Sequence, residues 1–241
     1  MIHKTLAALA LAAVVSAAPL GGGTGVERLS YSWRLQGGFS WLARVAFPSS
    51  GRGTLETQEA NTVHSQLTIQ GKEASTFYLY ESSMLPDATK TLSSRNAYSF
   101  RDDMRDERVS FDTSNGVAHV QKTTNDGRET KLKKLESAAP QDVLTSIYYL
   151  RQHADEIRAP KKAEIFSGAK SYDVMYIPQA TTTVRAAGSN VRVRPFTIKP
   201  LDRDKANIGE VRVWLTDDAR HVPVRIDIEQ KYATLKLDLQ P

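Results

Sequence analysis

Alternation of apolar and polar residues with a period of two runs through most of this chain and most constrains its fold. Apolar side chains occupy every second position of residues 29–35 and again of residues 39–47, on either side of Gly37 and Gly38. Such alternation is typical of strands with one buried face, and paired glycines favour a tight turn because glycine adopts positive φ at little cost. We therefore expect an antiparallel hairpin over residues 29–47.

The same pattern recurs further along the chain, with turn residues between the runs. Thr113 to Gly116 and Asn125 to Gly127 separate three runs in the middle of the chain, which indicates a meander. Pro223 lacks a backbone N–H and is expected at an edge, at a bulge or in a strand's first turn. Further strands are expected over residues 109–112, 117–122, 128–135, 172–176, 211–215, 222–228 and 235–239.

One segment favours a helix, over residues 142–151. Pro140 suits a first helical turn, and Val143, Ile147 and Leu150 share one helical face. Asp142 at the start and Arg151 at the end complement the helix dipole. A single amphipathic helix between strands has to pack on a face of the sheet.

These elements predict an all-β, mainly antiparallel fold: a curled sheet or open β-barrel with one docked mid-chain helix. A sheet of about ten strands rarely stays flat, and the helix would fill its concave side. No linker or repeat divides the chain. We therefore expect one barrel-like domain over residues 28–241.

The N-terminus predicts export. Lys4 precedes an apolar run over residues 6–15, and Val15, Ser16 and Ala17 form a cleavage site for signal peptidase. The run is too short for a membrane-spanning helix, which needs about twenty residues. We expect a signal peptide over residues 1–17, a flexible segment over 18–27, and a mature protein that does not span the membrane.

Composition narrows the compartment and the partners. The chain has no cysteine, which fits a bacterial periplasm better than an oxidising extracellular space. The formal net charge of +5 comes without a polybasic block, which argues against nucleic acid. Arg192 and Arg194 would project from one strand face, either as two solvated arginines or as a patch for an anionic head group.

No constellation of catalytic or metal-binding residues is apparent. The sequence has no Gly-x-Ser-x-Gly or Ser-x-x-Lys motif, no phosphate-binding glycine loop and no EF-hand. His64, His119, His153 and His221 are scattered, so each is expected in an ordinary surface or half-buried role. Residues 101–108 mix both charges and are expected to form a solvated loop. We predict no enzyme activity, metal or cofactor.

Large aromatic side chains are the remaining candidates for a ligand site. They could line an apolar cavity, and a tyrosine hydroxyl could orient an amphiphile. Plain core packing explains such residues equally well. The candidates are Tyr31, Trp33, Phe77, Phe100, Tyr148 and Tyr149.

Two segments carry a resemblance. The helix over residues 142–151 and the hairpin over residues 213–226 resemble a family of exported bacterial proteins classified only as a domain of unknown function. The order of the parts also matches, and the resemblance implies no catalytic residues. The architecture is more distantly similar to the periplasmic lipoprotein carriers, whose curved antiparallel sheet encloses an apolar cavity capped by helices.

Three functions follow as hypotheses. The first is a periplasmic, non-catalytic protein that binds a lipid or other apolar molecule in cell-envelope maintenance. It requires an unfilled apolar volume beneath the helix. The second is a structural or partner-binding envelope protein with a filled barrel and an exposed edge strand or apolar patch. The third, a cell-wall or polysaccharide hydrolase, requires two carboxyl groups that converge in a cleft.

Overall fold

A computed structural model describes residues 25–37, 49–71, 77–100, 102–167, 169–202, 209–229 and 233–241. The expected signal peptide and the expected strand over residues 39–47 lie outside these ranges. The first described strand begins at Val26, two residues before the expected start of the domain.

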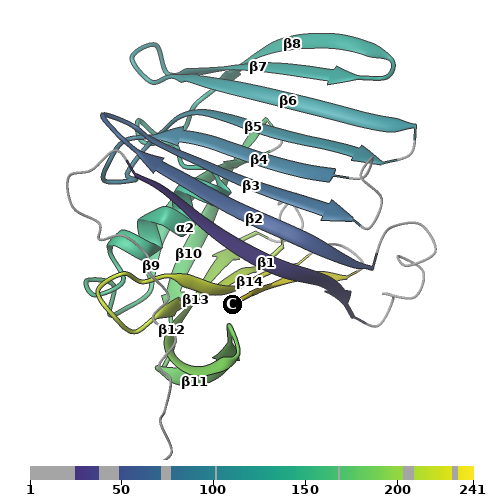
Figure 1. The fold of residues 1–241 in the computed structure, drawn as a ribbon. Coiled ribbons are helices and arrows are strands. Elements are labelled where there is room, and N and C mark those ends of the chain that lie inside the picture. Colours follow the sequence, from purple (N-terminus) through teal and green to yellow (C-terminus); the bar gives the residue numbers. More distant parts are fainter. Residues whose placement is uncertain are drawn as a thin grey trace, which may run out of the picture.

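Most of the described chain forms one antiparallel sheet (Figure 1). The strands are β1 (Val26–Gln36), β2 (Ser50–Glu59), β3 (Val63–Gly71), β4 (Phe77–Met84), β5 (Thr91–Phe100), β6 (Asp103–Asp112), β7 (Val117–Thr124), β8 (Gly127–Lys134), β9 (Lys161–Ser167), β10 (Lys170–Pro178), β11 (Thr182–Ala186), β12 (Ser189–Pro200), β13 (Val211–Thr216), β14 (Pro223–Glu229) and β15 (Thr234–Leu239). The expected strands within the described ranges are therefore confirmed.

Strands β1 to β8 are neighbours in chain order, and so are β13 to β15. The two halves of the sheet join where β1 pairs with β15, from Tyr31 opposite Leu239 to Gln36 opposite Thr234. Strands β8 and β9 stand at the two ends of the strand order, so the sheet is open. This confirms the mainly antiparallel, open barrel-like fold.

Burial follows the sequence alternation. On β3, Val63, Ser65, Leu67 and Ile69 are buried, while the residues between them are more accessible. Because side chains on a strand alternate between the two faces, this pattern fixes which face lies against the core. Pro223 is the first residue of β14, next to a register shift between Trp214 and Leu215 on β13, as the missing N–H requires.

Helix α2 (Val143–Gln152) packs on the inner face of the sheet, against β3, β4 and β9 (Figure 1). Its N-cap is Asp142, whose side chain accepts a hydrogen bond from the backbone N–H of Thr145. All residues from Leu144 to Arg151 are buried. The predicted docked helix is thus confirmed, and it is enclosed around most of its circumference.

The charged segment that was expected to form a loop is mostly a strand, with only Asp102 of its described residues in a turn. From Asp103 onwards it belongs to β6, so the loop prediction for residues 101–108 was wrong. Its charges are paired both across the sheet and along the strand: Arg95 on β5 donates two hydrogen bonds of 2.9 Å to Asp106, and Arg108 on β6 itself donates one of 3.2 Å. Cross-strand ion pairs of this kind allow charged residues to occupy a sheet.

Candidate functional site

The six aromatic candidates do not form one site. Tyr31 and Trp33 on β1 and Tyr148 and Tyr149 on α2 all belong to the main core. Phe77 and Phe100 lie near the ends of β4 and β5, half-buried, and strand alternation places them on opposite faces of the sheet. The assignment of the six residues to ligand binding stays a prediction.

The polar ends of the four central aromatics are already occupied. The Tyr31 hydroxyl donates to the backbone O of Pro223 at 2.6 Å, and Trp33 Nε1 donates to the backbone O of Gln70 at 2.7 Å. The Tyr148 hydroxyl donates to Glu59, and the Tyr149 hydroxyl accepts a bond from Lys161. These polar groups therefore form hydrogen bonds between separate elements of the protein and do not point into open space.

The indole of Trp33 reaches Gln70 by crossing Gly51, which lies on the strand between them. A Cβ atom at Gly51 would lie 1.9 Å from the backbone O of Gln70 and 2.6 Å from Trp33 Nε1. Only glycine leaves room for the ring at this position.

A hollow that touches α2, next to Tyr80 and Leu144, has a volume of about 50 Å³. That volume holds a water molecule or two but no acyl chain.

The start of α2 is anchored by a buried polar network. Asp142 accepts hydrogen bonds from Ser82 on β4 and, at 2.7 Å, from the backbone N–H of Thr145. The Thr91 hydroxyl donates to Thr145 at 2.7 Å, and the Tyr176 hydroxyl donates to Gln141 at 2.5 Å. Burial raises the pKa of Asp142 above its usual value, although the bonds from Ser82 and Thr145 act to lower it.

This raised pKa predicts a pH dependence. Between the unfolded pKa and the higher folded pKa, the folded protein binds more protons than the unfolded chain, so stability falls as pH rises through that interval. Asp142→Asn cannot ionise and should not show this fall. We expect the unfolding free energy of the wild type minus that of the variant to decrease from about pH 4 upwards. Urea denaturation at a series of pH values measures the difference, and a difference that increases with pH would contradict the assignment.

Arg192 and Arg194 do project from one strand face, but they are not a free anion site. Both bind Asp217, at 2.9 and 2.8 Å, and Arg194 also binds Asp155 at 2.7 Å. His221 Nε2 lies 3.1 Å from the same Asp155. Arg192 remains solvated, whereas Arg194 is largely buried, so the expectation of two solvated arginines was right only for the first.

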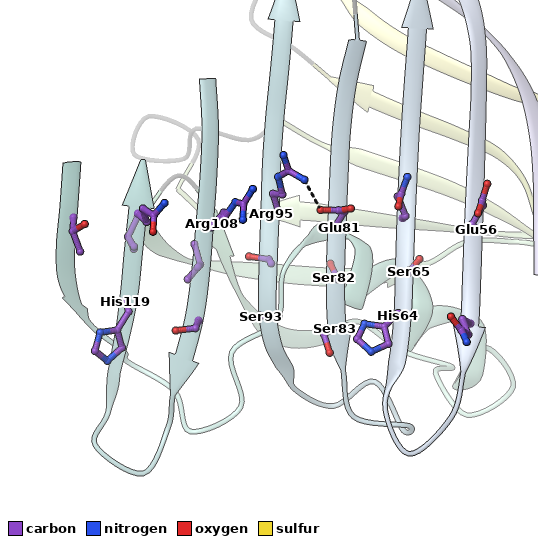
Figure 2. A pocket seen from close by; sticks show the side chains of 18 of the residues that line it. Glu56, His64, Ser65, Glu81, Ser82, Ser83, Ser93, Arg95, Arg108 and His119 are labelled. Atoms are coloured by element: carbon purple, nitrogen blue, oxygen red, sulfur yellow. Dashed lines mark hydrogen bonds and ion pairs between the residues drawn. The ribbon is translucent and has the colours of Figure 1, made fainter. Parts of the chain in front are cut away.

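A hollow of about 800 Å³ lies on the outer face of the sheet, away from α2. Figure 2 shows polar side chains that project from several neighbouring strands there. The strand register aligns them in two rows. One row is Glu56, Gln66, Glu81, Arg95, Arg108, Gln121 and Thr130; the other is Gln58, His64, Ser83, Ser93, Ser110 and His119.

The charged groups of this outer groove bind one another. Glu56 lies 2.9 Å from Arg28, and Glu81 lies 3.3 Å from Arg95. Glu56 and Glu81 stand two strands apart, about 10 Å at the usual spacing, and each is held in its own ion pair. His64 and His119 are four strands apart, about 19 Å at the usual spacing.

Among the described strands, β8 has a neighbour on one side only, which leaves it a free backbone edge. Its two-residue turn pairs Thr124 with Gly127, and the N–H of Leu135 donates to the backbone O of Gly116 at 2.9 Å. In this register the odd-numbered residues of β8 bond to β7. The N–H and C=O groups of the even-numbered residues, Arg128, Thr130, Leu132 and Lys134, therefore point to the side where the strand order ends. Leu132 is 64% exposed on this strand.

Next to this edge, on the inner face of the sheet, lies a hollow of about 210 Å³ lined mainly by cations. Its charged residues are Arg105, Lys122, Lys131, Lys133, Lys170, Glu107 and Glu129. Glu107 is bound by Arg105 at 2.5 Å, and Glu129 is bound by Lys131. The bond from Lys131 lowers the pKa of Glu129, and Lys122 and Lys133 add to the effect.

Sequence reasoning predicted a strand here but not the site. The run over residues 128–135 showed the strand, and its lysines were visible, but nothing in the local sequence shows that the strand has a neighbour on one side only.

In the described part of the chain, no cluster of three or more His, Cys, Asp or Glu residues could hold a metal ion. No helix in the described ranges is long and apolar enough to cross a bilayer.

Within the described residues, these features define an open, barrel-like antiparallel sheet with one helix packed on its inner face and with β8 at one end of the strand order. Residues 39–240 match the family described as protein of unknown function DUF3108, and the chain belongs to this family. The expected membership of a family of unknown function is thus confirmed, whereas the export of the protein stays a prediction.

A solved structure shares the fold. It is the crystal structure of a beta-barrel-like protein of the domain of unknown function DUF1849 from Brucella abortus. The match has a TM-score of 0.58 and 11% sequence identity, and covers 88% of this chain and 94% of the other. Among curated proteins, no significant match is found.

Proposed function

We propose that this protein is an exported, non-catalytic protein of the bacterial envelope that binds another polypeptide through the free edge of β8. The observation that carries the proposal is the row of backbone groups at Arg128, Thr130, Leu132 and Lys134, which have no strand partner within the described residues. Such a row is a template for strand addition, in which main-chain hydrogen bonds supply affinity and alternate side chains supply specificity.

The close packing around α2 and the hydrogen bonds of the core aromatics favour binding of a partner over carriage of a lipid. The hollow beside Tyr80 and Leu144 on α2 is about 50 Å³, and the polar ends of the central aromatics bond to the protein itself. Carriage of an acyl chain needs an enclosed apolar volume several times larger. The outer groove is polar and open, so it offers no such volume either.

Proline at Thr130 tests the edge directly. Because the Thr130 N–H points away from β7, Thr130→Pro removes a donor from the free edge but no bond from the sheet. We expect extended peptides selected from a display library to bind the wild type and to bind Thr130→Pro at least about tenfold more weakly. Thr130→Val keeps the N–H and is the matched control.

Amide hydrogen exchange by NMR locates the bound peptide. Binding at the edge should slow exchange at Thr130 and Leu132, whereas the amides of Lys131 and Lys133 already bond to β7 and should change little. Selected peptides that leave the amides of β8 unprotected would refute the proposal. So would a stoichiometric lipid recovered from the purified protein by solvent extraction and mass spectrometry.

A further inference from the structure

We infer that the segment recognised at β8 is acidic: an extended polypeptide with Asp or Glu at alternate positions, whose carboxylates enter the cationic hollow beside this strand. The inference rests on the proposed function and names the class of partner. The strand edge would supply affinity for any extended chain, and the hollow would select among such chains by charge.

The hollow carries an excess of positive charge. Five cations and two carboxylates line it, and each carboxylate already has a partner among the cations. Lys122, Lys133 and Lys170 make no ion pair within the described residues. Ammonium groups gathered on one surface repel one another, and bound carboxylates relieve that repulsion.

The register places these cations where an added strand would meet them. Lys131 lies opposite Val120 and Lys133 opposite Ala118, and both of those β7 residues are buried on the inner face. Lys131 and Lys133 therefore project from the inner face too. A strand added to the free edge of β8 would lie about 4.8 Å away, with every second side chain beside these lysines.

The outer face of β8 indicates which residue types the partner would carry on the outer face of the added strand. Arg128, Thr130, Leu132 and Lys134 project to that side, and Leu132 is 64% exposed there. An added strand would cover Leu132 best with a β-branched or aromatic residue on its own outer face. The expected pattern is therefore an acidic residue alternating with an apolar or hydroxyl residue.

Charge also argues against two other occupants. A second copy of β8 would place Arg128, Lys131, Lys133 and Lys134 against the same cations, which is unfavourable for cross-strand pairs. An anionic membrane is flat, whereas these lysines line a hollow between β6, β7 and β8 on one side and Ala169 and Lys170 on the other. An extended acidic chain can enter the hollow along the strand edge.

Three peptides of equal length test the inference with the full chain. Each alternates Thr or Val with a second residue, which is Glu in the first, Gln in the second and Lys in the third. We expect the Glu peptide to bind about tenfold more tightly than the Gln peptide, to bind more weakly at high salt, and to protect the amides of Thr130 and Leu132. The Lys peptide should show no measurable binding.

Charge variants assign the preference to the hollow. The double variant Lys131→Gln with Lys133→Gln should bind the Glu and Gln peptides about equally. The matched control, Arg158→Gln with Arg185→Gln, removes the same charge from exposed positions outside β8 and should keep the tenfold preference. Loss of the preference in the control as well would mean that net charge alone selects the peptide, and would overturn the inference.

The outcomes separate the two proposals. If the Gln peptide binds as tightly as the Glu peptide and protects the same amides, edge recognition stands and the acidic class is wrong. If no peptide protects the β8 amides, the proposed function fails. If vesicles containing phosphatidylglycerol bind the wild type and Thr130→Pro equally while the Glu peptide shows no preference, the cations serve a membrane surface and the inference is overturned.

Discussion

Replacing Glu27 by alanine is expected to lower the free energy of unfolding by about 3 kcal/mol, because it leaves a buried guanidinium without its counter-ion. Arg151, near the end of α2, is 5% exposed and holds both carboxylate oxygens of Glu27 on β1. Its Nε also donates to the backbone O of Arg220 at 3.0 Å. Burial disfavours the charged form of Arg151, but Glu27 outweighs it and the pKa stays above its usual value.

The control for this prediction lies on the next strand. Glu56→Ala also breaks an ion pair with an arginine, but Arg28 is 65% and Glu56 35% exposed, so the loss should stay below about 1 kcal/mol. Urea denaturation followed by circular dichroism measures both variants. Equal losses for Glu27→Ala and Glu56→Ala would show that the buried pair does not hold the helix to β1.

Replacing Asp142 by alanine is expected to cost between about 2 and 3 kcal/mol. The change removes the N-cap of α2, which contributes about 1 kcal/mol, and leaves the Ser82 hydroxyl and the Thr145 N–H buried without an acceptor. Differential scanning calorimetry should show a lower melting temperature and a single transition, since the helix and the sheet share one core.

Asp87→Ala provides the comparison. Asp87 makes the same types of bond, accepting from the backbone N–H of Thr89 at 3.1 Å and from its hydroxyl at 2.8 Å, but it is exposed. Its removal should change stability by less than about 0.5 kcal/mol. A cost for Asp142→Ala as small as that for Asp87→Ala would mean that the network at the helix start contributes nothing beyond an ordinary turn.

Local patterns predicted the elements of this fold well. Alternation located the strands, and Asp142 with the apolar positions of residues 143–150 located the helix within one residue at each end. The charged segment from Asp103 was missed because its strand character comes from pairing with Arg95 on β5, a contact that the segment's own residues do not reveal. Charge alone is therefore a weak reason to predict a loop.

The candidate site was less predictable, for a physical reason. Alternation tells which face a side chain is on, but not how deeply that face is buried or which strand lies beside it. Tyr31 and Trp33 were visible as aromatic, yet only the tertiary structure shows that both belong to the main core and that the Trp33 indole lies against Gly51 and bonds to Gln70. The free edge of β8 depends on the position of β8 in the whole sheet, which no run of eight residues encodes.

The pairing of β1 with β15 has a consequence for the order in which the molecule forms. Tyr31 meets Leu239 only after almost the whole chain is available, so one side of the earliest strand must wait for the latest one. Contacts between such distant residues slow folding. A chain still being synthesised would hold β1 with a single neighbour, β2. Shortening the protein before residue 234 would remove β15 and leave β1 and β14 each with an unpaired edge in the middle of the sheet.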